Sequence, residues 1–131
     1  MGILSQKHFL GIQTATQGDL QKIIDTGFMF REVLDRPIKK VPSLKGLNIV
    51  NLFFENSTRT KMSFELAEKR LSADVTNFAA STSSLQKGET LKDTIQNIHA
   101  MKMDCIVMRH GVPGSVWQLT EFVDAVVVNA G

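Results

Sequence analysis

The sequence predicts an α/β fold, a doubly wound parallel sheet of about four strands with helices on both faces. Four short strand-like segments, two of them apolar runs, alternate with segments of helical periodicity along the chain. The first run, residues 47–54, is almost unbroken and contains the β-branched Ile49 and Val50, as expected for a strand buried on both faces. Each interval between runs has room for one crossover helix, and such connections are right-handed. Ligands of these folds bind beyond the carboxyl ends of the strands.

The composition indicates one globular domain over residues 1–131. Hydrophobic residues make up 43% of the chain and charged residues 21%, which excludes disordered, collagen-like and coiled-coil proteins. Fifteen Lys and Arg against thirteen Asp and Glu leave a net charge of +2, too balanced for a surface that binds nucleic acid. No apolar run approaches the roughly 20 residues of a membrane helix. Cys105 is the single cysteine and no secretory leader opens the sequence, so we expect a reducing, cytoplasmic location.

The first predicted helix covers residues 16–34. Apolar residues recur there at i, i+3 and i+4, so we expect one face of the helix to dock on the core, with residues 28–30 part of that core. Pro37 and Pro42 end the helix. The basic segment over residues 36–45 is predicted to be a solvated connection.

The second predicted helix, residues 57–71, follows the first strand directly. Phe64, Ala67 and Leu71 form its apolar stripe, whereas charged residues that include Glu68 lie on its other faces. We therefore expect Ala67 on the buried face of this helix and Glu68 away from it.

The remaining segments continue the alternation of strand and helix. A polar loop over residues 81–88 precedes a helix that Thr90 and Asp93 are placed to cap. The predicted elements are a strand at 73–79, a helix from Thr90 to about Met101, a strand at 104–108, a helix at 113–122 and a strand at 125–128.

Polar side chains gather where the first strand meets the second helix, which is where a ligand is expected. Ser57, Thr58, Arg59 and Thr60 open that helix. The first turn of a helix presents unpaired N–H groups and the positive end of its dipole, and a guanidinium can grip a phosphate through two hydrogen bonds. This pattern predicts an anion site. It is equally compatible with Ser57 and Thr58 capping the helix while Arg59 pairs with a carboxylate.

Known nucleotide-binding loops and metal sites are not evident in the sequence. Neither G-x-x-x-x-G-K-[ST] nor G-x-G-x-x-G occurs in the chain. His8 and His99 have no partner at a spacing that suits a metal. We therefore expect no metal and no cofactor.

The polar cluster belongs to a longer pattern that resembles a known family. Residues 53–60, followed by residues 63–65 and 69–71, closely resemble the carbamoyl phosphate signature of the aspartate and ornithine carbamoyltransferases. Residues 81–91 resemble the mobile loop of the aspartate branch, because the ornithine branch carries Arg-Gly-Glu where this chain has Lys-Gly-Glu. The quoted stretches are Phe53-Phe54-Glu55-Asn56-Ser57-Thr58-Arg59-Thr60, Ser63-Phe64-Glu65, Lys69-Arg70-Leu71, Ser81-Thr82-Ser83-Ser84-Leu85-Gln86-Lys87-Gly88-Glu89-Thr90-Leu91, Met108-Arg109-His110 and Asn129-Ala130-Gly131.

The resemblance implies a role for each matching residue. Residues 57–60 would bind the phosphate, and Thr60 and Arg109 would also reach the carbamoyl oxygen. Ser83 or Ser84, together with Lys87, would complete the site of a neighbouring subunit, which implies a homotrimer with shared sites. The resemblance gives supporting roles to Glu55 and Glu89. His110 adjoins Arg109 at the end of a strand, so we expect it to pack behind the site.

The resemblance also implies an activity, transfer of a carbamoyl group from carbamoyl phosphate to L-aspartate in pyrimidine biosynthesis. The second domain of the family, which binds the amino acid, is not in this sequence, so we expect residues 1–131 to be an incomplete carbamoyl phosphate domain that is inactive alone. The alternatives are ornithine as the acceptor and a non-catalytic phosphate-binding or assembly module. At Ser72 relatives commonly have Gly, a position suited to a left-handed helix cap.

Overall fold

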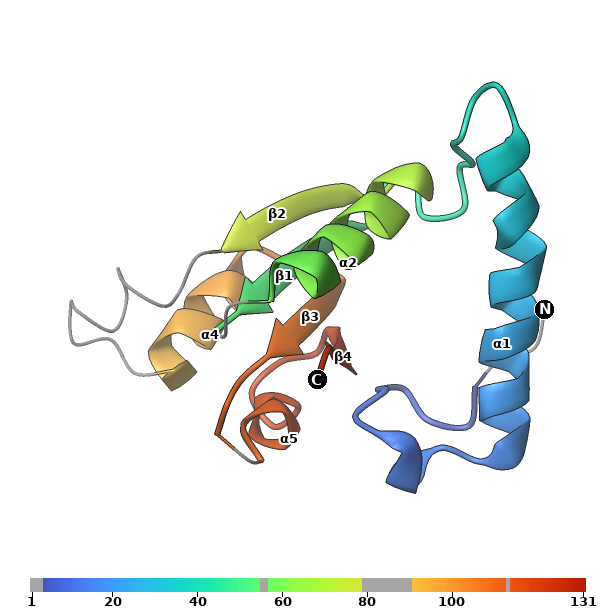
Figure 1. Cartoon of the computed structure of the whole chain (residues 1–131). Helices are drawn as coiled ribbons and strands as arrows, with labels where there is room; N and C mark the ends of the chain where they lie inside the picture. Colours follow the sequence, from blue (N-terminus) through green and yellow to red (C-terminus); the bar gives the residue numbers. More distant parts are fainter. Residues whose placement is uncertain (1–3, 55–56, 79–90, 113) are drawn as a thin grey trace.

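Four parallel strands form one sheet among the described residues. The structure is a computed structural model that describes residues 4–54, 57–78, 91–112 and 114–131. The sheet has the order β2-β1-β3-β4, and every neighbouring pair is parallel (Figure 1). This arrangement confirms the predicted fold class. The strands are β1 (Asn48–Phe53), β2 (Asp74–Phe78), β3 (Cys105–Arg109) and β4 (Val126–Asn129).

Helices cover both faces of this sheet. α2 packs on one face, and α4 and α5 pack on the other (Figure 1). α5 is shorter than predicted because, after Leu119, the chain turns through i→i+3 hydrogen bonds to the carbonyls of residues 118 and 119. In the described ranges, no helix has the length and apolar character needed to cross a membrane. The helices are η1 (Ile12–Thr14), α1 (Gln17–Arg31), η2 (Glu32–Asp35), α2 (Thr58–Arg70), α4 (Leu91–Ala100) and α5 (Ser115–Leu119).

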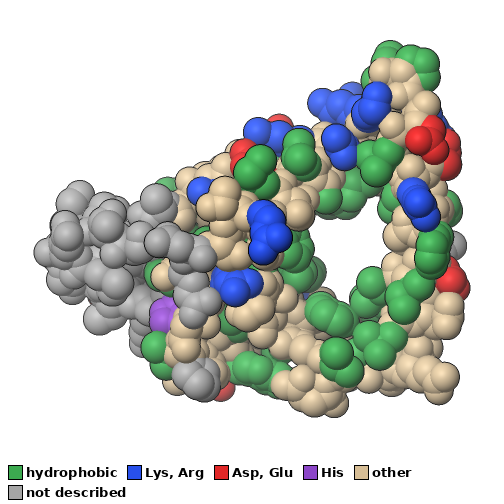
Figure 2. Space-filling model, viewed as in Figure 1, with side chains coloured by type: hydrophobic (Ala, Val, Ile, Leu, Met, Phe, Trp, Pro, Cys, Tyr) green, Lys and Arg blue, Asp and Glu red, His purple; other side chains and the backbone are tan. Residues whose placement is uncertain are grey.

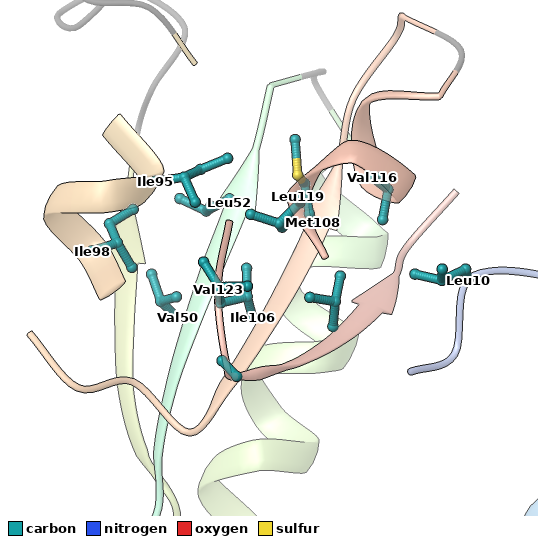
Figure 3. Close-up of a cluster of buried hydrophobic side chains, with 12 residues drawn as sticks. Leu10, Val50, Leu52, Ile95, Ile98, Ile106, Met108, Val116, Leu119 and Val123 are labelled. Atoms are coloured by element: carbon teal, nitrogen blue, oxygen red, sulfur yellow. The ribbon is translucent and has the colours of Figure 1, made fainter. Parts of the chain in front are cut away.

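β1 is the most buried strand, and its side chains alternate between two cores. Val50 and Leu52 point into a cluster with α4 and α5, where Leu52 has no exposed surface (Figure 3). Ile49 and Phe53 point to the other face and pack with Phe64 of α2. Burial on both faces explains why this segment is apolar at almost every position.

The N-terminal segment pairs with the free edge of strand β4. The Phe9 N–H donates to the Val127 carbonyl at 2.9 Å, and the Asn129 N–H donates to the Phe9 carbonyl at 2.8 Å. The Val127 N–H also donates to Nδ1 of His8 at 3.0 Å. These bonds satisfy backbone groups that an open edge would leave unpaired.

α1 begins as predicted, but its apolar face does not dock on the core. Thr16 and Asp19 form a capping box at its start. Phe28 is 65% exposed and Met29 53% exposed, so the prediction that they belong to the core is wrong. α1 faces α2 across an open channel of about 680 Å³, and hydrophobic side chains surround the opening (Figures 1 and 2). An apolar stripe shows that a helix has a face to bury, but not which surface covers it.

α2 has the predicted extent, but the side chains that it buries differ from those predicted. Glu68 is only 5% exposed, whereas Ala67 is exposed. Phe64, Glu68 and Leu71 lie at i, i+4 and i+7, which fits a helical stripe as well as the set with Ala67. The prediction is wrong because it assigned faces by polarity, and Glu68 has a buried polar partner on β1.

The chain leaves α2 through a left-handed residue, Ser72, with φ of 71°. The left-handed cap that the family resemblance implied at this position is confirmed. The Ser72 Oγ donates to the Val41 carbonyl at 2.8 Å, and the Val41 N–H donates to the Arg70 carbonyl at 2.8 Å. Together these bonds join Val41 to the end of α2.

Glycine and alanine at position 72 separate backbone strain from the hydroxyl bond. Both remove the hydroxyl, which costs about 1 kcal/mol, but only Ala keeps a Cβ in the left-handed region, which costs roughly 1–2 kcal/mol. We expect Ser72→Gly to be more stable than Ser72→Ala by about 1 kcal/mol in urea unfolding. Equal stability of the two variants would contradict this assignment of strain.

Candidate active site

An open recess lies where β1 passes into α2, at the carboxyl edge of the sheet. Its volume is about 640 Å³, and it is lined by residues 57–60 and Ser63. The four residues predicted to bind an anion are therefore brought together on one wall. Open α/β sheets bind ligands at this edge, so fold and sequence agree on the location.

The N-terminus of α2 is not capped by the residue placed to cap it. Ser57 is the N-cap residue, yet its side chain accepts no hydrogen bond from the first turn. Instead the Ser57 Oγ donates to the Thr60 Oγ1 at 2.9 Å. Within the described residues, the N–H groups of the first turn therefore lack the bond that a capping Ser57 would supply, and the helix dipole makes this end favourable for an anion.

Arg59 lies exposed in the first turn of α2. Within the described part of the chain, no carboxylate pairs with it. Ser63 donates from its Oγ to the Arg59 carbonyl at 2.9 Å, which secures the backbone and leaves the guanidinium out of that contact. For the described residues, these contacts do not support the alternative of a capping serine and an ion-paired arginine.

Arg109 ends β3 at the same edge of the sheet but does not line the recess. It is opposite Phe53 in the parallel register, and its carbonyl accepts from the Phe54 N–H at 2.8 Å. Its Nη1 donates to the Ala130 carbonyl at 3.2 Å. A Cβ at Gly131 would lie 2.6 Å from that Nη1, so glycine gives the guanidinium room. Ala130 and Gly131 thus contact the Arg109 guanidinium.

His110 packs beside the site. Its ring lies 4.8 Å from the Phe54 ring, centroid to centroid, at an angle of 48°. Its Nδ1 accepts from the Val112 N–H at 3.0 Å. These contacts hold the loop after β3 against the residue that follows β1.

The remaining predicted site residues lie outside the described part of the chain. Among the described residues, no group of three or more His, Cys, Asp and Glu side chains is arranged to hold a metal ion. The site residues outside that part are Glu55, Ser83, Ser84, Lys87 and Glu89.

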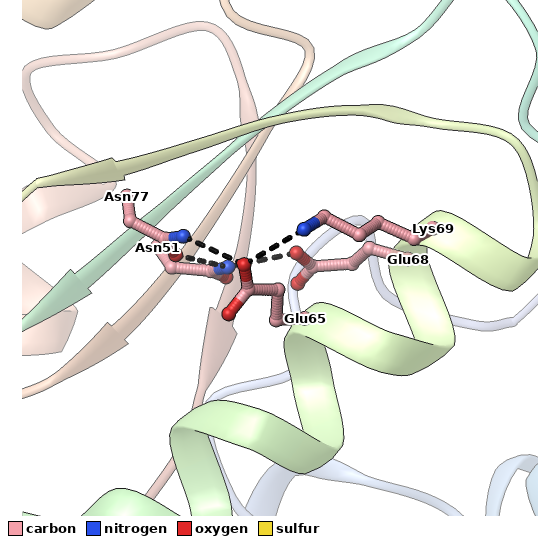
Figure 4. A network of polar contacts seen from close by, with 5 residues as sticks. All are labelled: Asn51, Glu65, Glu68, Lys69 and Asn77. Carbon is pink, nitrogen blue, oxygen red and sulfur yellow. Dashed lines mark hydrogen bonds and ion pairs between the residues drawn. The ribbon is translucent and has the colours of Figure 1, made fainter.

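A buried polar network under α2 was missed by the sequence analysis. Asn51, which is fully buried on β1, donates from Nδ2 to Glu68 Oε1 at 2.8 Å and to Asn77 Oδ1 at 3.1 Å (Figure 4). Asn77 donates from Nδ2 to Glu65 Oε1 at 3.0 Å, and Lys69 donates to the same oxygen at 3.0 Å. The one available signal was Asn51, a polar residue inside an otherwise apolar run.

The two carboxyl groups of this network titrate in opposite directions. Hydrogen bonds from Lys69 and Asn77 lower the pKa of Glu65 below its ordinary value. Burial raises the pKa of Glu68, by more than the hydrogen bond from Asn51 lowers it, and the nearby charge of Glu65 raises it further. Burial also raises the pKa of the neighbouring Cys105 thiol to about 11.

The sequence matches one family model over almost its whole length. The model describes the aspartate/ornithine carbamoyltransferase, carbamoyl-P binding domain, and it matches residues 7–131. The chain belongs to the aspartate/ornithine carbamoyltransferase family. This membership confirms the resemblance that began with residues 53–60.

Relatives within this family are longer than the chain. It is 57% identical over 131 residues to the aspartate carbamoyltransferase catalytic subunit of Cytophaga hutchinsonii, covering 100% of the chain and 43% of the relative. It is 59% identical over 128 residues to the catalytic subunit of Christiangramia forsetii, covering 98% of the chain and 41% of the relative. The chain therefore spans about two-fifths of the length of the curated relatives that it matches.

Solved carbamoyltransferase structures share the fold. The aspartate transcarbamoylase of Trypanosoma cruzi in complex with carbamoyl phosphate superposes with a TM-score of 0.87 at 31% identity, over 98% of this chain and 39% of that one. The catalytic subunit of M. Jannaschii aspartate transcarbamoylase gives a TM-score of 0.84 at 34% identity, over 96% of this chain and 41% of that one. These likenesses confirm the predicted fold class.

Alanine substitutions at the N-cap residues of α1 and α2 test whether the hydroxyls at the start of α2 stabilise the helix. Thr16→Ala removes a capping box and should cost about 1 kcal/mol of unfolding free energy. Ser57→Ala removes no cap bond, and we expect it to cost less than about 0.5 kcal/mol, because Thr60 Oγ1 is half-exposed and water can replace the lost partner. Urea unfolding measures both variants. A loss from Ser57→Ala as large as that from Thr16→Ala would show that Ser57 does cap the helix.

Proposed function

We propose that residues 1–131 form the carbamoyl phosphate-binding domain of an aspartate carbamoyltransferase. The observation that carries this proposal is the uncapped start of α2, where hydroxyls and Arg59 line a recess at the carboxyl edge of the sheet. The family match and the two relatives named as aspartate carbamoyltransferase catalytic subunits support the same assignment.

The reaction requires positioning and charge stabilisation from the protein. The α-amine of L-aspartate attacks the carbamoyl carbon of carbamoyl phosphate, the C–O bond to phosphate breaks, and the amine loses a proton, giving carbamoyl aspartate and phosphate. Negative charge builds on the carbamoyl oxygen and on the departing phosphate. In the proposed mechanism, residues 57–60 bind the phosphate, and Thr60 and Arg109 stabilise the carbamoyl oxygen.

The remaining parts of the site are proposed to come from outside the described residues. Lys87 and either Ser83 or Ser84 reach the site of a neighbouring subunit in a homotrimer, and Glu55 and Glu89 support the arginines. A second domain binds L-aspartate, so residues 1–131 alone turn over little or no substrate. We place the protein in the cytoplasm, in pyrimidine biosynthesis.

Neither alternative function has an observation that favours it. The relatives reported above are named for aspartate rather than ornithine. A non-catalytic module need not keep its anion-binding side chains, yet Ser57, Arg59, Thr60 and Arg109 are all present.

Titration calorimetry with carbamoyl phosphate tests the site directly. We expect saturable binding that Arg59→Ala weakens about 10- to 100-fold, because a charge-assisted hydrogen bond contributes about 1.5–3 kcal/mol. Arg59→Lys should fall in between, since lysine keeps the charge but not the paired geometry. Sedimentation of the same samples reads the oligomeric state.

The matched control for this titration is Lys40→Ala. Lys40 is an exposed cation beside Val41, which bonds to the far end of α2. Removing it changes the net charge equally but should leave affinity unchanged. If Lys40→Ala and Arg59→Ala weakened the affinity for carbamoyl phosphate equally, the anion would be responding to the overall charge, and this would contradict the assignment of the site.

A further inference from the structure

The contact between Asn51 and Glu68 contains two buried polar atoms without a partner. These are Asn51 Oδ1 and Glu68 Oε2, the only side-chain atoms of this kind among the described residues. Both belong to planar groups that already meet through the 2.8 Å bond from Asn51 Nδ2 to Glu68 Oε1. Leaving a buried polar atom unpaired costs free energy of folding, so each of these atoms is expected to have a hydrogen-bond partner.

Donors and acceptors along the network fix the orientation of both amides. Glu65 is held as a carboxylate by Lys69, so it can only accept, and Asn77 must turn its Nδ2 toward it. Asn77 then offers Oδ1 to Asn51, which must turn its own Nδ2 toward Asn77 and Glu68. Asn51 Oδ1 is therefore an acceptor that still needs a donor.

An ionised Glu68 cannot supply that donor. A carboxylate only accepts hydrogen bonds, so Asn51 Oδ1 and Glu68 Oε2 would both remain acceptors in an apolar interior. None of the ion pairs among the described residues includes Glu68, and the charge of Glu65, which acts on it, is also negative. A proton on Oε2 turns one of the two unpaired atoms into a donor for the other.

We propose that Glu68 carries a proton on Oε2 in the folded protein and donates it to Asn51 Oδ1, so that a carboxylic acid–amide pair positions α2 on the sheet. The pair joins the third turn of α2 to the centre of β1, between the two apolar positions Ile49 and Phe53. It therefore fixes the rotation of the helix whose first turn lines the recess. Glu68 is in this sense a positioning residue and not a catalytic one. Only the consequence for anion binding rests on the proposed function.

The proton makes the pair sensitive to alkaline pH. Because burial raises the pKa of Glu68 above 4.5, the folded state binds one more proton than the unfolded state between 4.5 and that raised value. Its contribution to stability is complete below 4.5 and is lost as pH rises through the raised pKa. The groups that face it do not titrate with it, because Lys69 keeps Glu65 ionised and the Cys105 thiol has a pKa of about 11.

The first test compares Glu68→Gln with the matched control Glu65→Gln on the same helix. Glutamine can donate to Asn51 Oδ1 at every pH, so it reproduces the protonated state. Infrared difference spectra at neutral pH should show the C=O stretch of a protonated carboxyl in the wild type and in Glu65→Gln, but not in Glu68→Gln. A missing band in the wild type overturns the proposal, because Glu68 would then be a carboxylate that water satisfies.

The second test follows unfolding in urea from about pH 5 to about pH 9. The wild type and Glu65→Gln should lose stability relative to Glu68→Gln as pH rises. The protection factors of the backbone amides of residues 61–64, which correct for the faster intrinsic exchange at high pH, should fall over the same range in those two proteins only. A protonated carboxyl with parallel pH profiles in all three proteins overturns the positioning role.

The third test links the pair to the recess through affinity for inorganic phosphate. At each pH, the ratio of the wild-type Kd to the Glu68→Gln Kd cancels the titration of phosphate itself. We expect this ratio to rise about fivefold or more from low to high pH. A constant ratio overturns the coupling of the pair to the recess. If neither protein binds phosphate, the proposed function fails, and the infrared, unfolding and exchange measurements still decide the role of Glu68.

Discussion

Burial of β1 between two parallel neighbours is the constraint on which the rest of the structure depends. The strand pairs with β2 on one side and β3 on the other, and residues 49–53 are buried. Its register with β3 places Phe53 opposite Arg109. The turn into α2 therefore starts beside the end of β3, and the residues that open α2 must lie at that edge. The location of the recess follows from strand pairing, before any side chain acts on a ligand.

α2 serves the site at one end and the core in its middle. Its first turn receives no cap bond from the Ser57 side chain, while its third turn buries a carboxyl against the side-chain amide in the centre of β1. An apolar contact alone tolerates small rotations of a helix, because dispersion forces have little directional preference. A hydrogen-bonded pair in the same contact does not, since a shifted helix would leave both polar groups unpaired. Apolar packing thus stabilises the contact between α2 and the sheet, and the polar pair fixes the orientation of the helix in that contact.

The sequence predicted the parts of this molecule that depend on local pattern. The alternation of short strand-like segments with helical periodicity predicted the four described strands, and a polar cluster after the first of them predicted four of the residues that line the recess. Contacts between distant segments escaped prediction. The apolar stripe of α1 did not reveal that its face borders an open channel, and the charge of Glu68 concealed its burial. The bond from Arg109 to Ala130 joins residues 21 positions apart, and no local pattern encodes it. The roles of Lys87 and the other site residues outside the described part stay predictions.

The strand order also has a consequence for biosynthesis. β1 lies at the centre of the sheet, yet its partner on one side, β3, follows 56 residues later in the chain, as the bond between Asn48 and Asp104 shows. At a synthesis rate of about 5–20 residues per second, the ribosome needs roughly 3 to 11 seconds to make the intervening segment. During that interval β1, the most buried of the described strands, has one edge without its final partner. Until residue 109 has left the ribosome, that edge is open to pairing with other chains, so the order of synthesis sets how long this sheet is exposed to aggregation.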